Sequence, residues 1–337
     1  MNSVYIAGLQ ADYGGPIRGG LEFLAPPAAV RRGDRVFIKP NLTFPAFRKG
    51  VMTNPECLEA LVVALKEHTG HITIGEADSG GYNRFGIDDV LAKTGIKGWE
   101  RKYGIRVVNL SRLPSRTVKF GSGGRERAFP FPELLTDEVD LVISAAVPKI
   151  HMNTGVSLTV KNLWGCIPDP SARLRLHPCL PQALLAITRQ VRRTIGLVDG
   201  RYGLNRSGPM LGEVVDLNWL LMGDSLYAAD VAACRLMQVN PARIGHLRSI
   251  EAAGHRMPTP DAIAFSQDWK PFVKEPFYLK RAWTDYPGLW AFRSPALTYL
   301  AYFSPLAGPL HRILYLFRKP FYNYREPGKT EVEDDST

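Results

Sequence analysis

Short apolar segments alternate with helical stretches through the first 240 residues, and this alternation constrains the fold more than any other feature of the sequence. Segments such as Val36-Phe37-Ile38 are apolar at every position, as expected of strands buried on both faces. Strands separated by helices favour a parallel sheet covered by helices. We therefore expect an α/β fold with a mostly parallel central sheet. The predicted strands are 4–9, 35–41, 72–76, 106–110, 140–146 and 195–199, and the predicted helices are 54–68, 88–94, 181–193 and 225–237.

Two regions depart from this alternation. Residues 116–132 contain a glycine-rich turn between two extended segments, which predicts a small antiparallel excursion. Beyond about residue 258 the sequence becomes rich in Pro, Trp and Tyr and loses its clean periodicity. We therefore divide the chain into an α/β domain over 1–258, an irregular, basic and aromatic-rich C-terminal extension over 259–330, and an acidic tail over 331–337.

Polar side chains interrupt the core-like segment 145–165, which follows a predicted central strand. They are Lys149, His151, Lys161 and Asn162. Burying an ammonium group is costly unless it is paired, so we expect these side chains to meet a ligand. Within the segment, residues 156–161 alternate between apolar and polar, which predicts a strand with one polar face.

Two further predicted strands end in polar residues, in Lys39-Pro40-Asn41 and in the loop 76–81. Ligands of open α/β sheets bind beyond the carboxyl ends of parallel strands, so we expect these ends to form one site for a carboxylate or phosphate. Lysine suits anion binding or proton transfer, histidine suits acid–base catalysis, and backbone N–H groups of a glycine loop can cradle an anion. The expected catalytic residues are His151, Lys149 and Lys161, and the expected substrate-binding residues are Lys39, Asn41, Ser79, Gly80, Gly81 and Asn162. The alternative is that each segment has a separate structural role.

Carboxylates near these segments offer a site for a divalent cation. The candidates are Glu76, Asp78, Asp199 and Asp230. Asp230 falls in a predicted helix of small apolar residues, where an unpaired carboxylate is costly, so it either pairs with a lysine or holds a cation. Cys166, His177 and Cys179 form an alternative soft triad, although their spacing matches no known zinc ribbon. The cofactor is otherwise unknown.

The net charge of +10 indicates an acidic partner, which is a nucleic acid, an anionic membrane face or an anionic small molecule. No nucleic-acid module is recognisable, so nucleic acid is not expected. The four cysteines are widely spaced, and we expect neither a disulfide framework nor an iron–sulphur cluster. The first residues lack a secretory pattern, so we expect a cytoplasmic protein, peripheral to a membrane if the C-terminal extension binds one.

The C-terminal extension contains an uncharged segment, 294–310, which at about 17 residues is at the lower limit for spanning a bilayer. From residue 270 to 325 basic residues outnumber acidic ones nine to two, and aromatic residues are frequent. This composition suits a segment lying on an anionic membrane, and packing on the sheet or in a homo-oligomer is the alternative. Two functions are consistent with the sequence: an enzyme acting on an anionic small molecule, or a non-catalytic accessory protein attached to a membrane face or partner through residues 270–325.

A series of short motifs identifies a family resemblance. They are VFIKPNL at 36–42, TNPE at 53–56, GEA at 75–77, PKIH at 148–151, VKNLWG at 160–165, VDG at 198–200, GP at 208–209 and DSLYAAD at 224–230. In this order they resemble the DUF362 family over roughly residues 35–240. The family's function is undefined, and some members look like iron–sulphur proteins through an attached ferredoxin-type cysteine cluster that this sequence lacks. The resemblance supports the α/β fold and the choice of site residues and implies no particular reaction.

Overall fold

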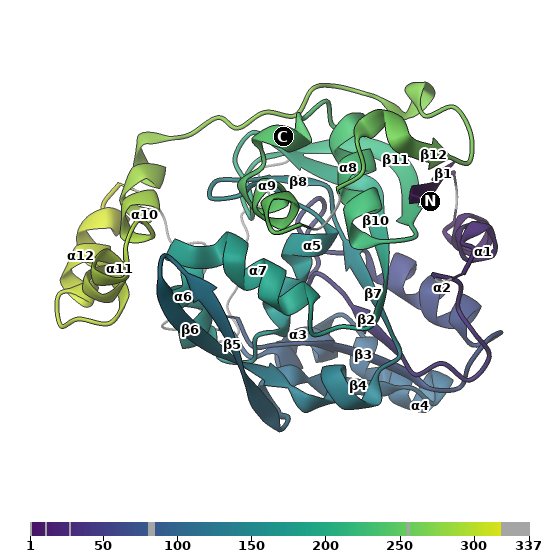
Figure 1. Cartoon of the computed structure of the whole chain (residues 1–337), viewed down its shortest axis with the longest axis horizontal. Helices are drawn as coiled ribbons and strands as arrows, with labels where there is room; N and C mark the ends of the chain where they lie inside the picture. The colour runs from purple at the N-terminus through teal and green to yellow at the C-terminus, as the bar shows by residue number, and fades with distance from the viewer. Residues whose placement is uncertain (1, 11, 27, 80–84, 255–256, 318–337) are drawn as a thin grey trace.

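The apolar segments form one mixed sheet with helices on both of its faces (Figure 1). The structure is a computed structural model that describes residues 2–10, 12–26, 28–79, 85–254 and 257–317. Along the central strand β2 (Val36–Lys39), Val36 and Ile38 enter one hydrophobic core and Phe37 enters the other. The strand is therefore apolar from Val36 to Ile38 and ends in the buried Lys39, and the predicted α/β fold is confirmed.

The sheet has ten strands, and the main path runs β12-β1-β11-β10-β7-β2-β3-β4. The strands besides β2 are β1 (Asn2–Gly8), β3 (Ile72–Glu76), β4 (Arg106–Asn109), β7 (Leu141–Ala146), β10 (Arg193–Asn205), β11 (Glu213–Gly223) and β12 (Ile263–Phe265). The run from β10 to β4 is parallel, as predicted. The long strand β11 was not predicted and lies antiparallel between β10 and β1. Two short strands lie beyond the end of β7: β8 (Lys149–His151), which pairs with β10, and β9 (Gly155–Ser157), which pairs with β8.

Helices cover the two faces in separate groups. One core contains side chains of α1 (Gly14–Phe23), α2 (Pro55–Leu65) and α3 (Ile87–Lys93), and Trp99 of α4 (Trp99–Tyr103). The other contains side chains of α5 (Thr159–Asn162), α6 (Pro170–Leu176), α7 (Leu180–Thr188), α8 (Leu226–Leu236) and α9 (Gly245–Ala252). Local sequence sets where the predicted helices begin. The Asn54 side chain accepts from the Glu56 N–H at the start of α2, and Ser225 caps α8 in the same manner.

The predicted antiparallel excursion is a hairpin of β5 (Ser115–Ser122) and β6 (Arg125–Pro132). Its turn is the pair Gly123-Gly124, and both residues have positive φ values, of 58° and 71°. Glycine adopts this backbone conformation without steric cost, which explains the glycine-rich sequence of the turn.

The predicted strand over 156–161 is wrong. Only Gly155–Ser157 is a strand, and the chain then turns into α5. The carboxylate of Asp230 accepts from the backbone N–H groups of Thr159, at 2.7 Å, and Val160, at 3.2 Å, and so holds the start of this short helix. The polar side chains of Ser157 and Thr159 are buried, so the alternation does not mark a solvent face, and only Lys161 at the end of the segment is partly exposed.

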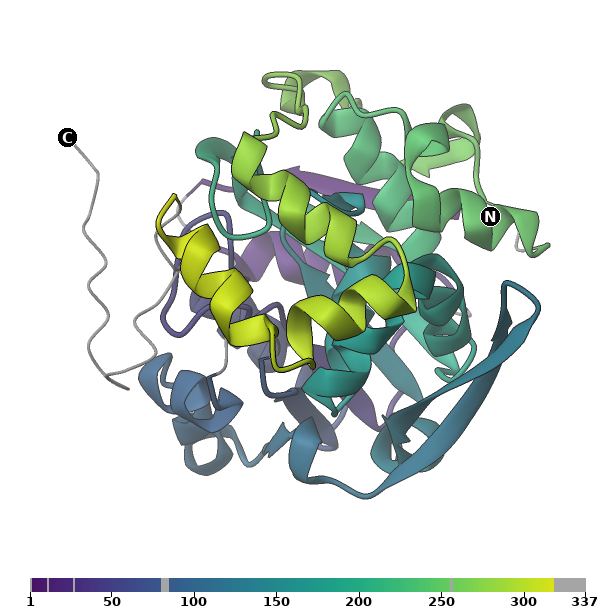
Figure 2. The same cartoon turned by 90° about the vertical axis from the view of Figure 1, so that its left-hand side faces the viewer.

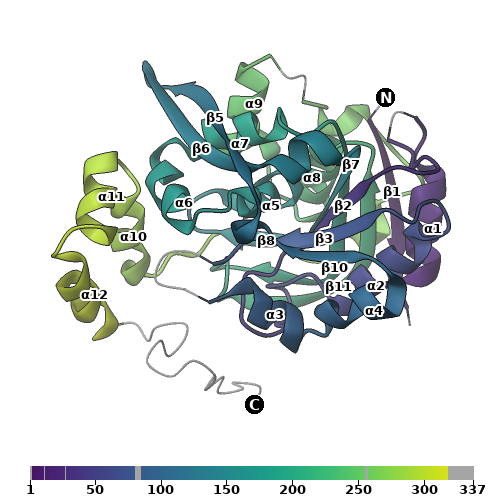
Figure 3. The same ribbon diagram turned by 90° about the horizontal axis from the view of Figure 1, so that it is seen from below.

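Residues after 258 do not leave the sheet at once. Strand β12 pairs in parallel with β1, so the predicted boundary at 258 does not separate the sheet from the C-terminal extension. The chain then forms three short helices, α10 (Tyr286–Ala291), α11 (Pro295–Tyr302) and α12 (Ala307–Tyr315), which stand beside α6 and away from the sheet (Figures 1 and 3). Within the described ranges, no helix is long and apolar enough to cross a membrane. The acidic tail 331–337 lies outside the described residues.

Candidate functional site

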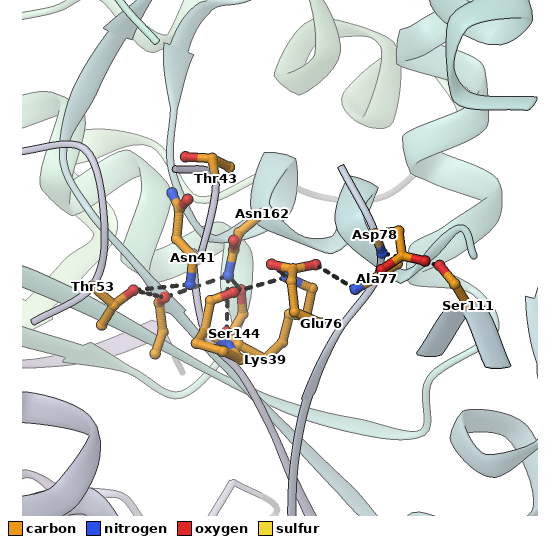
Figure 4. A network of polar contacts seen from close by, with 12 residues as sticks. Lys39, Asn41, Thr43, Thr53, Glu76, Ala77, Asp78, Ser111, Ser144 and Asn162 are labelled. Carbon is orange, nitrogen blue, oxygen red and sulfur yellow. Dashed lines mark hydrogen bonds and ion pairs between the residues drawn. The ribbon is translucent and has the colours of Figure 1, made fainter. Parts of the chain in front are cut away.

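A pocket of about 200 Å³ opens where β2 and β3 end. Its wall comes from the residues after these strands, from α5 with the turn after it, and from α6. Its polar lining consists of Asn41, Thr43, Glu76, Ser79, Ser157, Lys161, Asn162, Arg173 and His177. The structure therefore brings together side chains from three strand-end segments, and Figure 4 shows several of them around the polar network beneath the pocket.

A buried ion pair between Lys39 and Glu76 forms the base of the site (Figure 4). Lys39 is fully buried and also donates to the carbonyl of Pro40 at 2.7 Å, while Glu76 accepts from the Ala77 N–H at 3.0 Å. Gly165 lies against this pair, because a Cβ at that position would be 2.3 Å from Glu76 Oε1 and 2.9 Å from Lys39 Nζ. The two charges balance each other, so the base of the pocket is neutral overall.

Two further cations give the pocket an excess of positive charge. Lys161 is partly exposed at the wall, with its ammonium 5.7 Å from the centre of the Trp164 ring. Burial, with the charges of Arg173 and Lys39, lowers the pKa of Lys161 to about 7. Arg173 is buried and its guanidinium donates to the carbonyl of Asp78. Neither cation forms an ion pair with a carboxylate among the described residues.

The two asparagines of the pocket differ in how firmly they are held. Asn162 donates to the carbonyl of Lys39 at 2.9 Å and to the hydroxyl of Ser144 at 3.1 Å, so its amide is fixed (Figure 4). The backbone of Asn41 is fixed as well, because its N–H donates to Thr53 Oγ1 at 2.9 Å. Its side-chain Oδ1, in contrast, is buried without a partner in the described structure. An unpaired buried oxygen is costly, so the Asn41 side chain is available to a ligand.

Lys149 and His151 do not line the pocket, although the sequence places them beside it. Lys149 is buried and donates to the carbonyl of Val51 at 2.7 Å, and burial, with the charge of Lys161, lowers its pKa to about 7. His151 is also buried, and its Nδ1 accepts from the Asn153 N–H at 3.1 Å. Burial lowers the pKa of His151 well below its usual value, so the ring is neutral. Of the three expected catalytic residues, only Lys161 reaches the pocket.

The carboxylates that were candidates for a metal belong to separate hydrogen-bond networks. Asp78 accepts from the Ile87 N–H and from Asn109, Asp199 accepts from Tyr13 and from the Asn54 N–H, and Asp230 holds α5. Asp230 thus binds backbone N–H groups and a hydroxyl, and it forms no ion pair with a lysine in the described part of the chain. Within that part no group of three or more His, Cys, Asp or Glu side chains is placed to hold a metal, Cys166, His177 and Cys179 included.

The predicted glycine-loop anion cradle is only partly visible. Ser79 lines the pocket, as expected of a substrate-binding residue. Gly80 and Gly81 lie outside the described residues.

Sequence reasoning missed Arg173, which reaches the pocket from a helix and not from a strand end. Helix α6 begins at Asp169, whose side chain accepts from the Ser171 N–H at 2.7 Å, with Pro170 at its first position. The Asp-Pro pair is a recognisable helix start, so the sequence did contain a signal for α6. His177 follows α6 and contacts the Arg173 carbonyl through Nδ1 at 2.8 Å. Its ring packs edge-on against that of Trp164, with 5.5 Å between the ring centres. Burial lowers the pKa of His177 to about 4.

The comparisons with known proteins place this geometry in context. The family model described as "Domain of unknown function (DUF362)" matches residues 36–235. A thylakoid-associated protein of Synechocystis sp. is 24% identical over 273 residues, which are 75% of this chain and 80% of that protein.

Two solved structures are similar at a low level. A protein from Thermotoga maritima has a TM-score of 0.40 and 16% identity over 67% of this chain and 59% of its own. The lactate racemase apoprotein from Thermoanaerobacterium thermosaccharolyticum has a TM-score of 0.45 and 15% identity over 70% of this chain and 57% of its own. The chain thus spans less than two thirds of either structure, and likeness at this level carries no information about activity.

Proposed function

The chain belongs to the DUF362 family, and from its pocket we propose that it binds a small carboxylate or phosphate anion and exchanges a proton with it through Lys161. One observation carries the proposal. Lys161 and Arg173 line the same pocket, and neither is neutralised by a carboxylate among the described residues. A pocket with uncompensated positive charge and partial burial binds an anion more strongly than an exposed lysine does, because less water screens the attraction.

The two cations suit different parts of anion recognition. A guanidinium such as that of Arg173 fits two oxygens of a carboxylate or phosphate in one plane, whereas the ammonium of Lys161 acts as a point charge. Ser79 and the unpaired Oδ1 of Asn41, which accepts a hydrogen bond, would then orient the remaining polar atoms of the ligand. The neutral Lys39–Glu76 pair beneath them holds the ends of β2 and β3 together and adds no net charge.

Lys161 is the group in this pocket best matched to proton transfer. With a pKa of about 7 it exists in both protonation states near neutral pH, as an efficient acid–base catalyst must. His177, whose pKa is lowered to about 4, is neutral at the same pH and contributes a wall to the pocket. The expected reaction class is a proton transfer to or from a small anionic substrate held by Arg173.

Replacing Lys161 with methionine is expected to weaken anion binding about 10- to 100-fold, because it removes one charged hydrogen-bond donor. The measurement is isothermal titration of the full chain with inorganic phosphate and with a small dicarboxylate such as succinate. Lys93→Met is the matched control, since Lys93 is exposed at the end of α3. Equal affinities for the Lys161 variant and the control, or no anion binding by the unaltered chain, would contradict the proposal.

Anion affinity is also expected to fall as the pH rises above about 7. Anion binding favours protonated Lys161. The affinity for the anion is therefore highest below the pKa of Lys161 in the unliganded protein, about 7, and falls by up to about tenfold per pH unit above it. Sulfate is the suitable probe, because its own charge does not change in this range. The affinity of Lys161→Met should be nearly independent of pH, and a variant that keeps the full pH dependence would assign the titration to another group.

A further inference from the structure

The C-terminal part of the described structure, from Trp283 onward, exposes large apolar side chains to an extent found nowhere else among the described residues. Before residue 283 no large apolar side chain is more than 51% exposed. We use the term C-terminal apolar surface for six residues that are each between 55% and 79% exposed: Trp290, Tyr299, Leu306, Ile313, Leu316 and Phe317. Surface patches of this kind on a soluble domain mark a binding site for a protein or a membrane.

Helix α12 and the residues that flank it contribute most of this surface. Leu310 and Ile313 of α12 fall with Leu306 before it and Phe317 after it at spacings of four, three and four residues, which is the spacing of one side of a helix. The other side faces inward, where Ala307 is buried and the His311 ring lies 5.5 Å from that of Tyr302. The apolar stripe of α12 is therefore additional to the residues that hold the helix in place.

The three helices are anchored to the domain through aromatic rings on their inner side. Phe292 stacks on His177 at 4.0 Å between ring centres and on Tyr302 at 5.3 Å. Arg175, on α6, lies over the ring of Phe303 at 4.6 Å. Figure 2 shows the helices in front of the domain, on its outer side. The unit has a fixed attachment to α6, and the C-terminal apolar surface lies outside that attachment.

The charged side chains in the segment that forms this surface are all positive. From residue 286 to 317 the sequence contains no Asp or Glu, and Arg293 and Arg312 are both exposed. The nearest acid before this segment, Asp285, is buried and accepts from the Ala282 N–H at 2.9 Å. Exposed Trp and Tyr together with arginine and aliphatic residues are typical of segments that lie at the lipid–water interface.

We propose that the C-terminal apolar surface docks on the interface of an anionic lipid bilayer. Leu306, Ile313 and Leu316 enter the boundary of the acyl chains, Trp290 and Tyr299 lie at the headgroups, and Arg312 contacts lipid phosphates. The positive charge of residues 286–317 is complementary to an anionic membrane, which attracts each arginine near its surface. The helices are short, so this is attachment parallel to the membrane and not insertion across it. The inference does not depend on the anion pocket.

Co-sedimentation of the full chain with vesicles tests this docking. We expect binding to vesicles of equal parts phosphatidylcholine and phosphatidylglycerol, weaker binding to phosphatidylcholine alone, and loss of affinity as salt is added. The double variant Ile313→Glu/Leu316→Glu should lose most of the binding, and Arg312→Glu should weaken it about 10- to 30-fold. The double variant and Arg312→Glu both alter exposed side chains, so the unfolding temperature of the protein should not change.

Two control variants introduce a glutamate at exposed positions outside the C-terminal apolar surface. Val214→Glu places the acid on an exposed position of β11, and Arg125→Glu reverses a charge at the tip of the hairpin; both should bind vesicles as the unaltered chain does. Equal binding by the double variant and the unaltered chain would overturn the proposal. So would a dimer that the double variant dissociates in the absence of any vesicle binding, because the surface would then join two copies of the chain.

Discussion

Replacing Lys39 with methionine will lower the free energy of unfolding by about 3–5 kcal/mol. The side chain is fully buried and forms the ion pair with Glu76. Methionine fills a similar volume but leaves the Glu76 carboxylate buried without a counter-charge, which is among the most destabilising changes a core can undergo. Urea denaturation of the full chain, followed by circular dichroism, measures the effect.

Two controls separate the charge effect from a change in packing. The double variant Lys39→Met/Glu76→Leu removes both charges and should recover much of the loss. Lys119→Met breaks the exposed ion pair with Glu126 in the hairpin and should cost less than about 1 kcal/mol. If Lys39→Met costs no more than Lys119→Met, the buried pair does not hold the strand ends together.

Replacing Asp230 with alanine will lower the free energy of unfolding by about 2–4 kcal/mol at about pH 5 and will also weaken anion binding. The carboxyl group accepts from the N–H of Thr159 at 2.7 Å, from its hydroxyl at 2.6 Å and from the N–H of Val160 at 3.2 Å. Alanine leaves the two buried N–H groups unpaired at the start of α5, whereas the hydroxyl keeps an acceptor in the Leu226 carbonyl at 3.1 Å. Lys161 is carried by this helix, so its position changes with it.

The pH dependence of this loss identifies its source. Burial raises the pKa of Asp230 to about 7, so the folded protein holds this proton more tightly than the unfolded chain does. The contribution of Asp230 to stability is complete below about pH 4 and decreases as the pH rises to about 7. The difference in the free energy of unfolding between the unaltered chain and Asp230→Ala should therefore become smaller as the pH rises across this range. Asp216→Ala, at an exposed position of β11, should unfold with the same free energy as the unaltered chain. A difference in the free energy of unfolding that grows with pH would contradict the raised pKa of Asp230.

Most of the parallel sheet could be predicted from the sequence because its central strands are buried on both faces. β2, β3 and β7 are runs of apolar residues flanked by helices, and this local pattern is sufficient to identify them. β11 could not be identified in this way, since its first half is largely exposed and its position beside β10 depends on pairing with residues far along the chain. The turn at α5 was missed because a distant carboxylate, Asp230, fixes its backbone.

The same distinction applies to the candidate site. Asn41 and Ser79 line the pocket because parallel strands bring their carboxyl ends to one edge, which is a rule of topology that sequence can use, whereas Asn162 reaches the pocket from α5. This rule does not place Lys149. The residue lies on β8, beyond the end of β7, where it pairs with Leu204 of β10. Its ammonium therefore donates to the Val51 carbonyl and does not reach the pocket. Arg173 enters from a helix whose position is set by tertiary packing, which no local pattern reveals.

The position of β1 in the sheet has a consequence for how the chain is made. β1 is the first described strand, yet its neighbours are β11 and β12, so that Val4 pairs with both Gly223 and Phe265. During synthesis the backbone N–H and C=O groups of β1 stay unpaired until nearly all the other strands of the sheet have left the ribosome. Closing so long a loop is slow, and an exposed strand edge is prone to wrong pairing in the meantime. Completion of the fold is therefore a late event in translation, and a nascent chain halted before residue 265 lacks one neighbour of β1.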